Sequence, residues 1–160
     1  MASKARSREL MSKFLFTVHD ADGGFQNSKF QKCTGQEMSV GIAEYAEGGA
    51  FAPLKEPGRV AFGNITLEHG VSDNLDFCNW MDQVCNMLSY TPEGAGLLTL
   101  DLIRDLYAIQ RDRTQTARIK WNFAAAFPAR WRGSEFDNTT DEVQVEELEL
   151  AHWYNYREAA

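Results

Sequence analysis

Histidine and aspartate side chains are the groups of this 160-residue chain best suited to acid–base or metal chemistry. His19-Asp20 and the nearby Asp22 resemble one piece of such a site. The other two histidines, His69 and His152, lie in separate predicted strands, so nothing in the sequence brings a third ligand or a partner base to them. We therefore expect no catalytic residue, no metal-binding residue and no cofactor site.

The spacing of the cysteines and glycines also predicts no metal site and no phosphate-binding loop. Cys33, Cys78 and Cys85 lack the C-x-x-C spacing of a zinc site, and we expect them to be reduced thiols packed in the core. The glycines at 23–24, 48–49 and 94–96 do not form G-x-G-x-x-G or a phosphate loop, so they indicate turns. No nucleophile–base pair can be named, and the sequence predicts a protein that is not an enzyme.

Charge and composition exclude further classes of protein. The net charge is −7 with 44% apolar and 24% charged residues, which is typical of a folded globular domain. The acidic excess disfavours nucleic-acid binding, so alternating aromatics such as Phe14, Phe16, Trp121 and Phe123 are interpreted as core rather than as a stacking platform. No stretch has the roughly 20 apolar residues of a membrane helix, and the N-terminus lacks an apolar signal region. We expect synthesis in the cytoplasm and no membrane partner.

The elements that must position these residues are mostly strands, since apolar residues alternate with a period of two through most of the chain. Phase slips at Gly63-Asn64 and Glu146-Glu147 predict β-bulges, and the Gly- and Pro-rich stretch 47–58 predicts a loop that becomes ordered only against a neighbouring subunit. The predicted strands cover residues 13–19, 30–34, 37–46, 59–69, 97–110, 116–127 and 142–153.

One helix is predicted over residues 73–89. Phe77, Met81, Val84 and Leu88 recur at helical spacing beside Trp80 and form a broad apolar stripe. Composition and periodicity thus predict a β-rich domain with one helix that associates with itself.

Several motifs that follow one another in a fixed order are more informative about the protein family than any single residue. Glu44-Tyr45 and a Gly48-Gly49 loop precede Pro57-Gly58-Arg59 and Phe62-Gly63-Asn64-Ile65-Thr66-Leu67, and a helix with Trp80 follows. The last third has Ala126-Phe127-Pro128-Ala129-Arg130-Trp131 and then Val145-Glu146-Glu147-Leu148-Glu149-Leu150-Ala151-His152. In this order the segments resemble the tail tube proteins of contractile phage tails and the inner-tube proteins of phage-tail-like contractile injection systems. The resemblance covers about residues 13–152.

The resemblance implies a mainly β fold, a β-sandwich or barrel subunit with one flanking α-helix, whose strands join into a ring-wide β-barrel. We expect a tail-tube domain at 13–160, preceded by an N-terminal arm at 1–12 that departs from the pattern of the family. The implied function is structural: hexameric rings stack into a tube around a channel for cargo delivery, assembled into a virion-like or extracellular injection particle. The implied partners are further copies of the chain, a contractile sheath protein, baseplate and tail-terminator proteins, and cargo in the lumen, without specific nucleic-acid binding.

Alternation of faces in barrel strands also suggests which groups line that channel. We expect a polar, mainly acidic lining from Asp101, Asp105, Glu147 and Glu149. The alternative is that these carboxylates face outward toward a basic sheath, because strand phase cannot distinguish inside from outside.

Two other functions remain open at this level. A secreted tube protein of the type VI secretion kind would share the fold and the ring symmetry. A small-ligand-binding β-barrel would be a monomer with its ligand at the barrel mouth.

Overall fold

The strands of this protein form one continuous folded sheet with a projecting hairpin. The computed structural model describes residues 11, 13–23, 25, 29–46, 48–49, 51–71, 75–90, 102–137, 139 and 141–160, with the side chains of 87–90 left aside. In chain order the elements are β1 (Phe16–Asp20), β2 (Phe30–Thr34), β3 (Met38–Tyr45), β4 (Leu54–Phe62), β5 (Ile65–Gly70), α1 (Asp76–Tyr90), β6 (Arg104–Arg111), β7 (Ala117–Arg132), β8 (Val145–Ala151) and β9 (Tyr154–Ala159).

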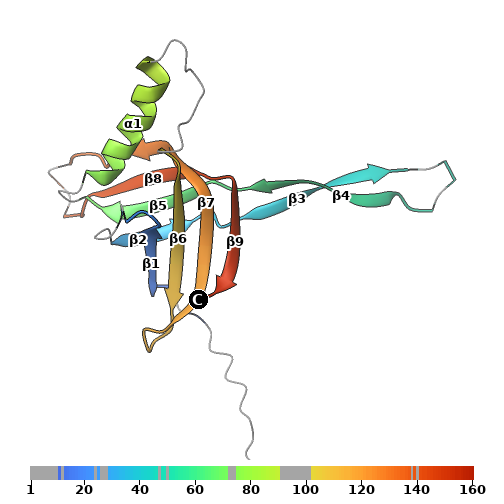
Figure 1. Cartoon of the computed structure of the whole chain (residues 1–160), viewed down its shortest axis with the longest axis horizontal. Helices are drawn as coiled ribbons and strands as arrows, with labels where there is room; N and C mark the ends of the chain where they lie inside the picture. Colours follow the sequence, from blue (N-terminus) through green and yellow to red (C-terminus); the bar gives the residue numbers. More distant parts are fainter. Residues whose placement is uncertain are drawn as a thin grey trace, which may run out of the picture.

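The long strand β7 belongs to two antiparallel sheets. Its first part pairs with β6 and β9, and β1 lies beyond β6; we call these four strands sheet A. Its last part pairs with β8, and β5 and β2 follow; we call these sheet B. The two sheets enclose the core in a sandwich-like arrangement that Figure 1 shows from the side of β6, β7 and β9. Among the described strands the path β1-β6-β7-β8-β5-β2 does not close into a barrel.

A sharp bend in β7 allows one strand to serve both sheets. Ala125 has φ 53°, a left-handed conformation that is rare for alanine, and its N–H donates to the carboxylate of Asp105 at 2.8 Å. The β6–β7 register shifts in the same region, between Arg104 and Leu106. The bend is therefore held by a side chain of the neighbouring strand.

The core lies between the sheets and is closed by α1. Trp80 and Phe77 of the helix are buried, and the indole N–H of Trp80 donates to the carbonyl of Leu102 at 2.9 Å. Phe25 packs edge-on against Phe77 with ring centroids 5.0 Å apart. The other buried apolar residues of this core cluster are Val18, Ile65, Leu67, Val84, Leu102, Leu106, Ala108, Phe123, Ala126, Leu148 and Leu150.

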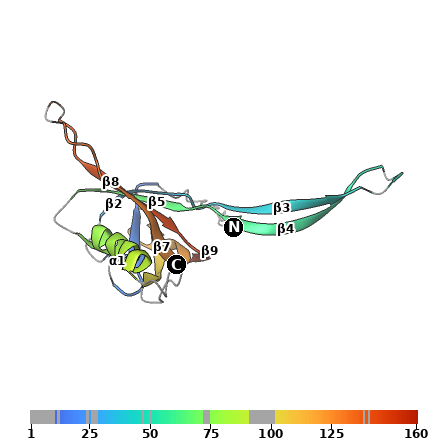
Figure 2. The ribbon, with the colours of Figure 1, turned by 90° about the horizontal axis from the view of Figure 1, so that it is seen from above.

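Strands β3 and β4 form a two-stranded hairpin that projects far from the body (Figures 1 and 2). Nearly every residue of both strands is exposed. At its base Gly35 has φ 92°, and a Cβ there would lie 1.9 Å from the carbonyl oxygen of Asn64. Only glycine fits this close approach, which fixes the hairpin to the start of β5.

Several sequence expectations are confirmed and several are wrong. The single helix, β2 and β3 agree with the predicted ranges. The predicted loop 47–58 is wrong for its second half, because residues from Leu54 onward belong to β4 and pair with β3. The predicted strand 59–69 is divided into β4 and β5, so Gly63-Asn64 is the joint between hairpin and body rather than a bulge.

The predicted bulge at Glu146-Glu147 is also wrong. Strand β8 pairs with β5 in unbroken register from Val145 to Leu150. The apparent phase slip arises because Val143 precedes the strand, and because Glu146 points into the core in phase with Leu148 and Leu150. Strand β9 was not expected, and residues 97–101 of the predicted strand 97–110 lie outside the described residues.

Candidate functional site

The histidines singled out in the sequence do not meet in one site. His19 lies on the outer face of sheet A, stacked on Tyr107 with ring centroids 5.2 Å apart, and burial and Arg111 lower its pKa. Asp20 points into the core and pairs with Arg104 at 3.2 Å. Arg104 in turn lies 4.6 Å from the ring centroid of Trp80, so the pair fixes the helix against sheet A.

His69 belongs to a buried polar cluster in sheet B. Its Nε2 lies 3.0 Å from Oε1 of Glu146, whose other oxygen accepts from the indole N–H of Trp131 at 2.9 Å. Phe77 stacks on the imidazole with ring centroids 4.7 Å apart. The ring of Phe30 in β2 also lies 6.1 Å from that of His69. The cluster thus joins β2, β5, β7, β8 and α1, which is a structural role. Within the described ranges no group of three or more His, Cys, Asp or Glu residues could hold a metal ion.

No disulfide joins the three cysteines, but their expected burial is wrong for the helix pair. Cys78 is half-buried and Cys85 is exposed, because Phe77, Trp80 and Val84 form the buried face of α1. Cys33 is half-buried at the edge strand β2, and the desolvation of its thiol raises its pKa to about 11.

The outer face of sheet A carries a continuous row of mutually satisfied polar and aromatic side chains. Lys120 lies 4.8 Å from the ring centroid of Tyr107 and forms an ion pair of 3.2 Å with Glu158. Asn122 donates to Glu158 at 2.8 Å, and these contacts lower the pKa of Glu158. The row therefore joins β1, β6, β7 and β9 without an excess of either charge.

The four carboxylates expected on one channel lining do not share a face. Asp105 holds the β7 bend in sheet A. Glu147 and Glu149 lie on the outer face of sheet B, where Asn64 donates to Glu149 at 2.8 Å. Asp101 lies outside the described residues. A single acidic wall built from these groups is therefore wrong.

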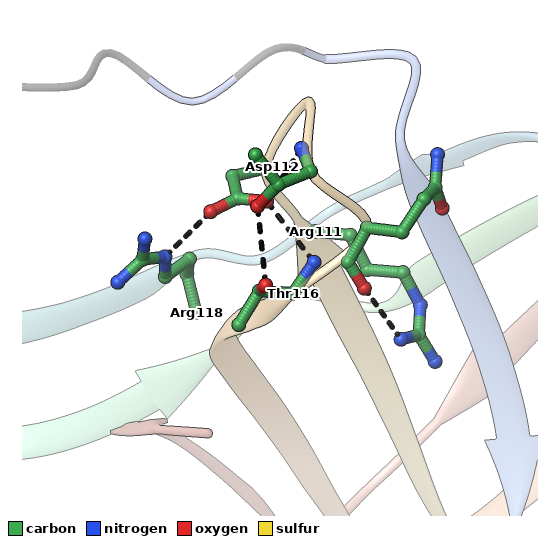
Figure 3. Close-up of polar contacts among 6 residues, drawn as sticks. Arg111, Asp112, Thr116 and Arg118 are labelled. Atoms are coloured by element: carbon green, nitrogen blue, oxygen red, sulfur yellow. Dashed lines mark hydrogen bonds and ion pairs between the residues drawn. The ribbon is translucent and has the colours of Figure 1, made fainter.

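Asp112 organises the turn between β6 and β7 (Figure 3). One carboxylate oxygen accepts from the backbone N–H groups of Thr114 and Thr116 and from the Thr114 hydroxyl, and the other accepts from Arg118 at 2.8 Å. These bonds lower the pKa of Asp112, with the Thr114 hydroxyl and Arg118 as the main causes. Gln115 has φ 64°, and its carbonyl accepts from Arg111.

Among the described strands of the body, β1, β2 and β9 each pair with a neighbour on one side only. An unpaired edge can add a strand from another chain. The β9 edge also carries exposed aromatic rings, Trp153, Tyr154 and Tyr156, the last two stacked with centroids 6.0 Å apart. Sheet A thus ends in β1 on one side and β9 on the other.

The projecting hairpin is the second candidate assembly surface. Exposed apolar side chains follow its length, and the ring of Phe51 at its tip is fully exposed. A lone two-stranded ribbon is at best marginally stable in water. The exposed apolar residues of the hairpin are Met38, Val40, Ile42, Tyr45, Phe51, Leu54 and Val60.

Comparison with known protein families identifies the family of this chain. The family model of the T4-like virus tail tube protein gp19 matches residues 12–155. The chain belongs to this tail tube family. No curated protein matches the chain significantly.

Solved structures show the same fold. The tube of an extracellular contractile injection system, the PVC sheath-tube complex in its extended state, is similar with a TM-score of 0.78 and 21% identity, and 100% of each chain is covered. The tube-terminating cap of the anti-feeding prophage is similar with a TM-score of 0.78 and 22% identity over 100% of each chain. Hcp1 from Flavobacterium johnsoniae is similar with a TM-score of 0.53 and 14% identity, over 92% of this chain and 97% of that one.

Sequence reasoning missed the residues that form the assembly surfaces. Pro53, Pro57 and Gly58 predict a loop where the structure has the first part of β4, and the alternation of Val60 and Phe62 does not extend across them. Tyr154 and Tyr156 of β9 are two residues apart, and this alternation of aromatic residues in the sequence favours a strand. No helix of the described residues is long and apolar enough to cross a membrane.

Proposed function

We propose that this protein is the structural inner tube subunit of a phage-tail-like contractile injection system. Hexameric rings stack into a tube that passes cargo, and sheath, baseplate and terminator proteins bind the tube. The subunit is not an enzyme, acts in an extracellular particle after synthesis in the cytoplasm, and consists of an N-terminal arm at 1–12 and a tail-tube domain at 13–160. Membership of the tail tube family and the fold shared with contractile tubes support this function.

The observation that carries the proposal is the pair of open edges of sheet A. When β9 of one copy pairs with β1 of the next, sheet A continues from subunit to subunit and its edges disappear. Every copy then makes the same head-to-tail contact, which closes into a ring when the rotation between copies is a whole fraction of a turn.

Ring closure also determines which face lines the channel. The core, sheet B and α1 all lie behind sheet A, on the side of Val18, Leu106 and Phe123. In a closed ring, the side of the subunit that carries sheet B and α1 has room only on the outside, where the circumference is larger. The outer face of sheet A, with Tyr107, Lys120 and Glu158, then lines the channel.

The pairing of β9 with β1 of the next copy can be tested at the open edge of β9. Ala160 N–H donates to the Arg118 carbonyl, and hydrogen-bonded positions alternate along an antiparallel pair, so the N–H of Arg157 points to the open edge. Proline at this position removes that donor and blocks strand addition while keeping the β7–β9 ladder. We expect Arg157→Pro to remain a folded monomer under conditions in which the parent protein forms rings.

Arg157→Ala is the matched control, because it removes the same side chain from above Trp121 and keeps the N–H. Light scattering of the three proteins measures the oligomer, and circular dichroism measures the fold. Rings of normal size from folded Arg157→Pro would contradict strand addition at β9.

The alternative of a small-ligand-binding barrel has little support. The described strands leave the sheet open, and the edges that would have to meet, β1 and β2, are not paired. The type VI-like alternative shares the fold of the Hcp1 structure. Sheath and baseplate genes of the phage-tail-like particle kind beside this one would favour the injection system over it.

A further inference from the structure

His152 lies where the β3–β4 hairpin leaves the body of its own subunit. It follows β8 directly, and its imidazole stacks on Phe123 of β7 with ring centroids 5.8 Å apart. The ring of Phe62, the last residue of β4, meets the imidazole edge-on with centroids 6.0 Å apart. The imidazole is therefore held between the body and the base of the hairpin.

Asn155 of β9 connects this histidine to the hairpin. Its side chain is buried, and its amide nitrogen Nδ2 lies 3.4 Å from Nε2 of His152 and 3.4 Å from the backbone carbonyl of Glu37, the residue before β3. The Glu37 carbonyl also accepts from the N–H of Gly63, the residue after β4, at 3.1 Å. One amide group thus ties β9 to the place where the hairpin enters and leaves the body.

This arrangement requires a neutral imidazole. Because Nδ2 of Asn155 donates to it, Nε2 of His152 is an acceptor without a proton, and the proton of the neutral ring is on Nδ1. Nδ1 of His152 and Oδ1 of Asn155 are buried and have no hydrogen-bond partner. The neutral state therefore leaves Oδ1 as an unused acceptor next to the ring.

A proton on Nε2 of His152 reverses the hydrogen bonding of this pair. The N–H groups of the Asn155 amide would then face an N–H of the imidazolium, and two donors cannot bond to each other. A half-turn of the amide brings the unused Oδ1 to the charged N–H, which gives a charge-assisted and stronger hydrogen bond. The same half-turn takes Nδ2 away from the Glu37 carbonyl, so β9 releases the base of the hairpin.

The groups packed around the imidazole make His152 the proton-sensitive member. The side chains that β4, β7 and β9 place against it are two phenyl rings and the Asn155 amide, none of which titrates in this range. Charged groups lie on the adjoining segments: Glu37 packs over the residue after β4, Arg157 lies over an indole ring of β7, and Glu149 is on the outer face of sheet B. Burial of the ring lowers the pKa of His152, and no charged group of the described residues contributes to that shift.

We propose that His152 and Asn155 form a proton-sensitive joint, which fastens the β3–β4 hairpin to β9 when His152 is neutral and releases it when His152 is protonated. The Gly63 N–H remains bonded to Glu37 in both states, so the pairing of β3 with β4 is kept and only the attachment of the hairpin to the body changes. The joint is internal to one subunit and does not depend on the proposed assembly.

Hydrogen exchange of the full-length protein, followed by mass spectrometry, tests the joint. Peptides spanning residues 36–41 and 61–65 are compared between about pH 7.5 and pH 5, with labelling times scaled for the intrinsic effect of pH on exchange. We expect both peptides to exchange about fivefold faster in acid, as for the loss of one hydrogen bond. Because the pKa of His152 is lowered in the folded state, the joint is complete above the ordinary value of about 6.5, and the midpoint of the response should lie below it.

Three variants define the response. His152→Gln keeps an acceptor for Asn155 but carries no titrating group, so its exchange should be slow and independent of pH. Asn155→Ala removes the amide and should give fast exchange at both pH values; Asn155→Asp lacks the donor but keeps the shape, and takes its place if circular dichroism shows that Asn155→Ala is unfolded. His19→Gln is the matched control, because His19 also has a lowered pKa but lies on the outer face of sheet A, and it should respond like the parent protein.

The contrary outcomes are equally distinct. A pH response that persists in His152→Gln, or that disappears in Glu37→Gln, would assign the proton to another group and overturn the joint. Slow exchange at about pH 7.5 in the folded Asn155 variant would show that the amide does not hold the hairpin base, and would also overturn it. Tubes with a hairpin base that exchanges independently of pH would contradict the joint alone, whereas a monomeric parent protein with the expected response would contradict the tube function alone.

Discussion

At the scale of single residues, the buried charged groups of this subunit hold elements together. Glu146 accepts from Trp131 and contacts His69, so one carboxylate ties β8 to β7 and β5. Asp20 does the same between β1 and Arg104, which also lies over Trp80. Because each group has partners at hydrogen-bond distance, its burial is compensated.

Removal of Glu146 should therefore destabilise the subunit. Glu146→Ala leaves Trp131 and His69 without their common partner, and we expect a loss of about 3 kcal/mol in unfolding free energy. Glu147 is the matched control, because its side chain lies on the outer face of sheet B, and Glu147→Ala should change stability by about 0.5 kcal/mol or less. Equal effects of the two substitutions in urea unfolding would contradict this role for Glu146.

Asp112 should make the β6–β7 turn sensitive to acid. Its pKa is lower in the folded than in the unfolded state, so its contribution to stability is fully present above the unfolded pKa of about 3.9 and is lost as pH falls toward the folded pKa. We expect Asp112→Asn to lower the Tm at pH 7, and the difference from the parent protein to shrink below about pH 4.

Asp137 is the control for that measurement. It accepts from the backbone and hydroxyl of Thr139 in a similar turn, and these bonds lower its pKa. No described ion pair of Asp137 corresponds to the Arg118 contact of Asp112, so Asp137→Asn should have the smaller effect. A Tm difference for Asp112→Asn that does not depend on pH would contradict the charge as its cause.

At the scale of elements, the bend of β7 at Ala125 allows one strand to pass from sheet A to sheet B. The left-handed conformation costs a residue with a side chain about 1–2 kcal/mol relative to glycine. Ala125→Gly should therefore not lower the unfolding free energy and should raise it by up to about 1 kcal/mol.

Ala124 is the adjacent residue of the same strand and provides the comparison. Glycine within a regular strand is unfavourable, so Ala124→Gly should lower stability by about 1 kcal/mol. If Ala125→Gly destabilised the protein as much as Ala124→Gly, the strain at Ala125 would be absent. Thermal unfolding of both variants measures the difference.

The sequence predicted most elements but not their grouping into sheets. Alternation identified β2 and β3, and the stripe of Phe77, Trp80 and Val84 identified α1, because these signals depend on local spacing. The position of Glu146 mimics a phase slip, since the sequence alone does not distinguish a buried carboxylate from an exposed one, and its partners His69 and Trp131 are distant in the chain. Likewise, strand phase could not show that Asp105 and Glu149 belong to different sheets.

At the scale of the whole molecule, the surfaces left open are those that an assembly would cover. The strands β1 and β9 end sheet A, and the hairpin exposes an apolar ribbon that has no core of its own. The family resemblance indicates self-assembly, and the motifs that carry it lie in β3, β4, β5, α1, β7 and β8. The aromatic edge at Trp153 and Tyr156 falls at the C-terminal end of those motifs and adds the surface through which copies are proposed to meet.

In the proposed assembly, copies of this chain join edge to edge through sheet A into a closed ring. Cryo-electron microscopy of the purified full-length protein at high concentration tests it most directly. We expect six-fold rings and stacked tubes with β9 of each subunit hydrogen-bonded to β1 of the next, and with Tyr107 and Lys120 facing the channel. Monomers without rings, or rings in which the β1 and β9 edges remain unpaired, would contradict it.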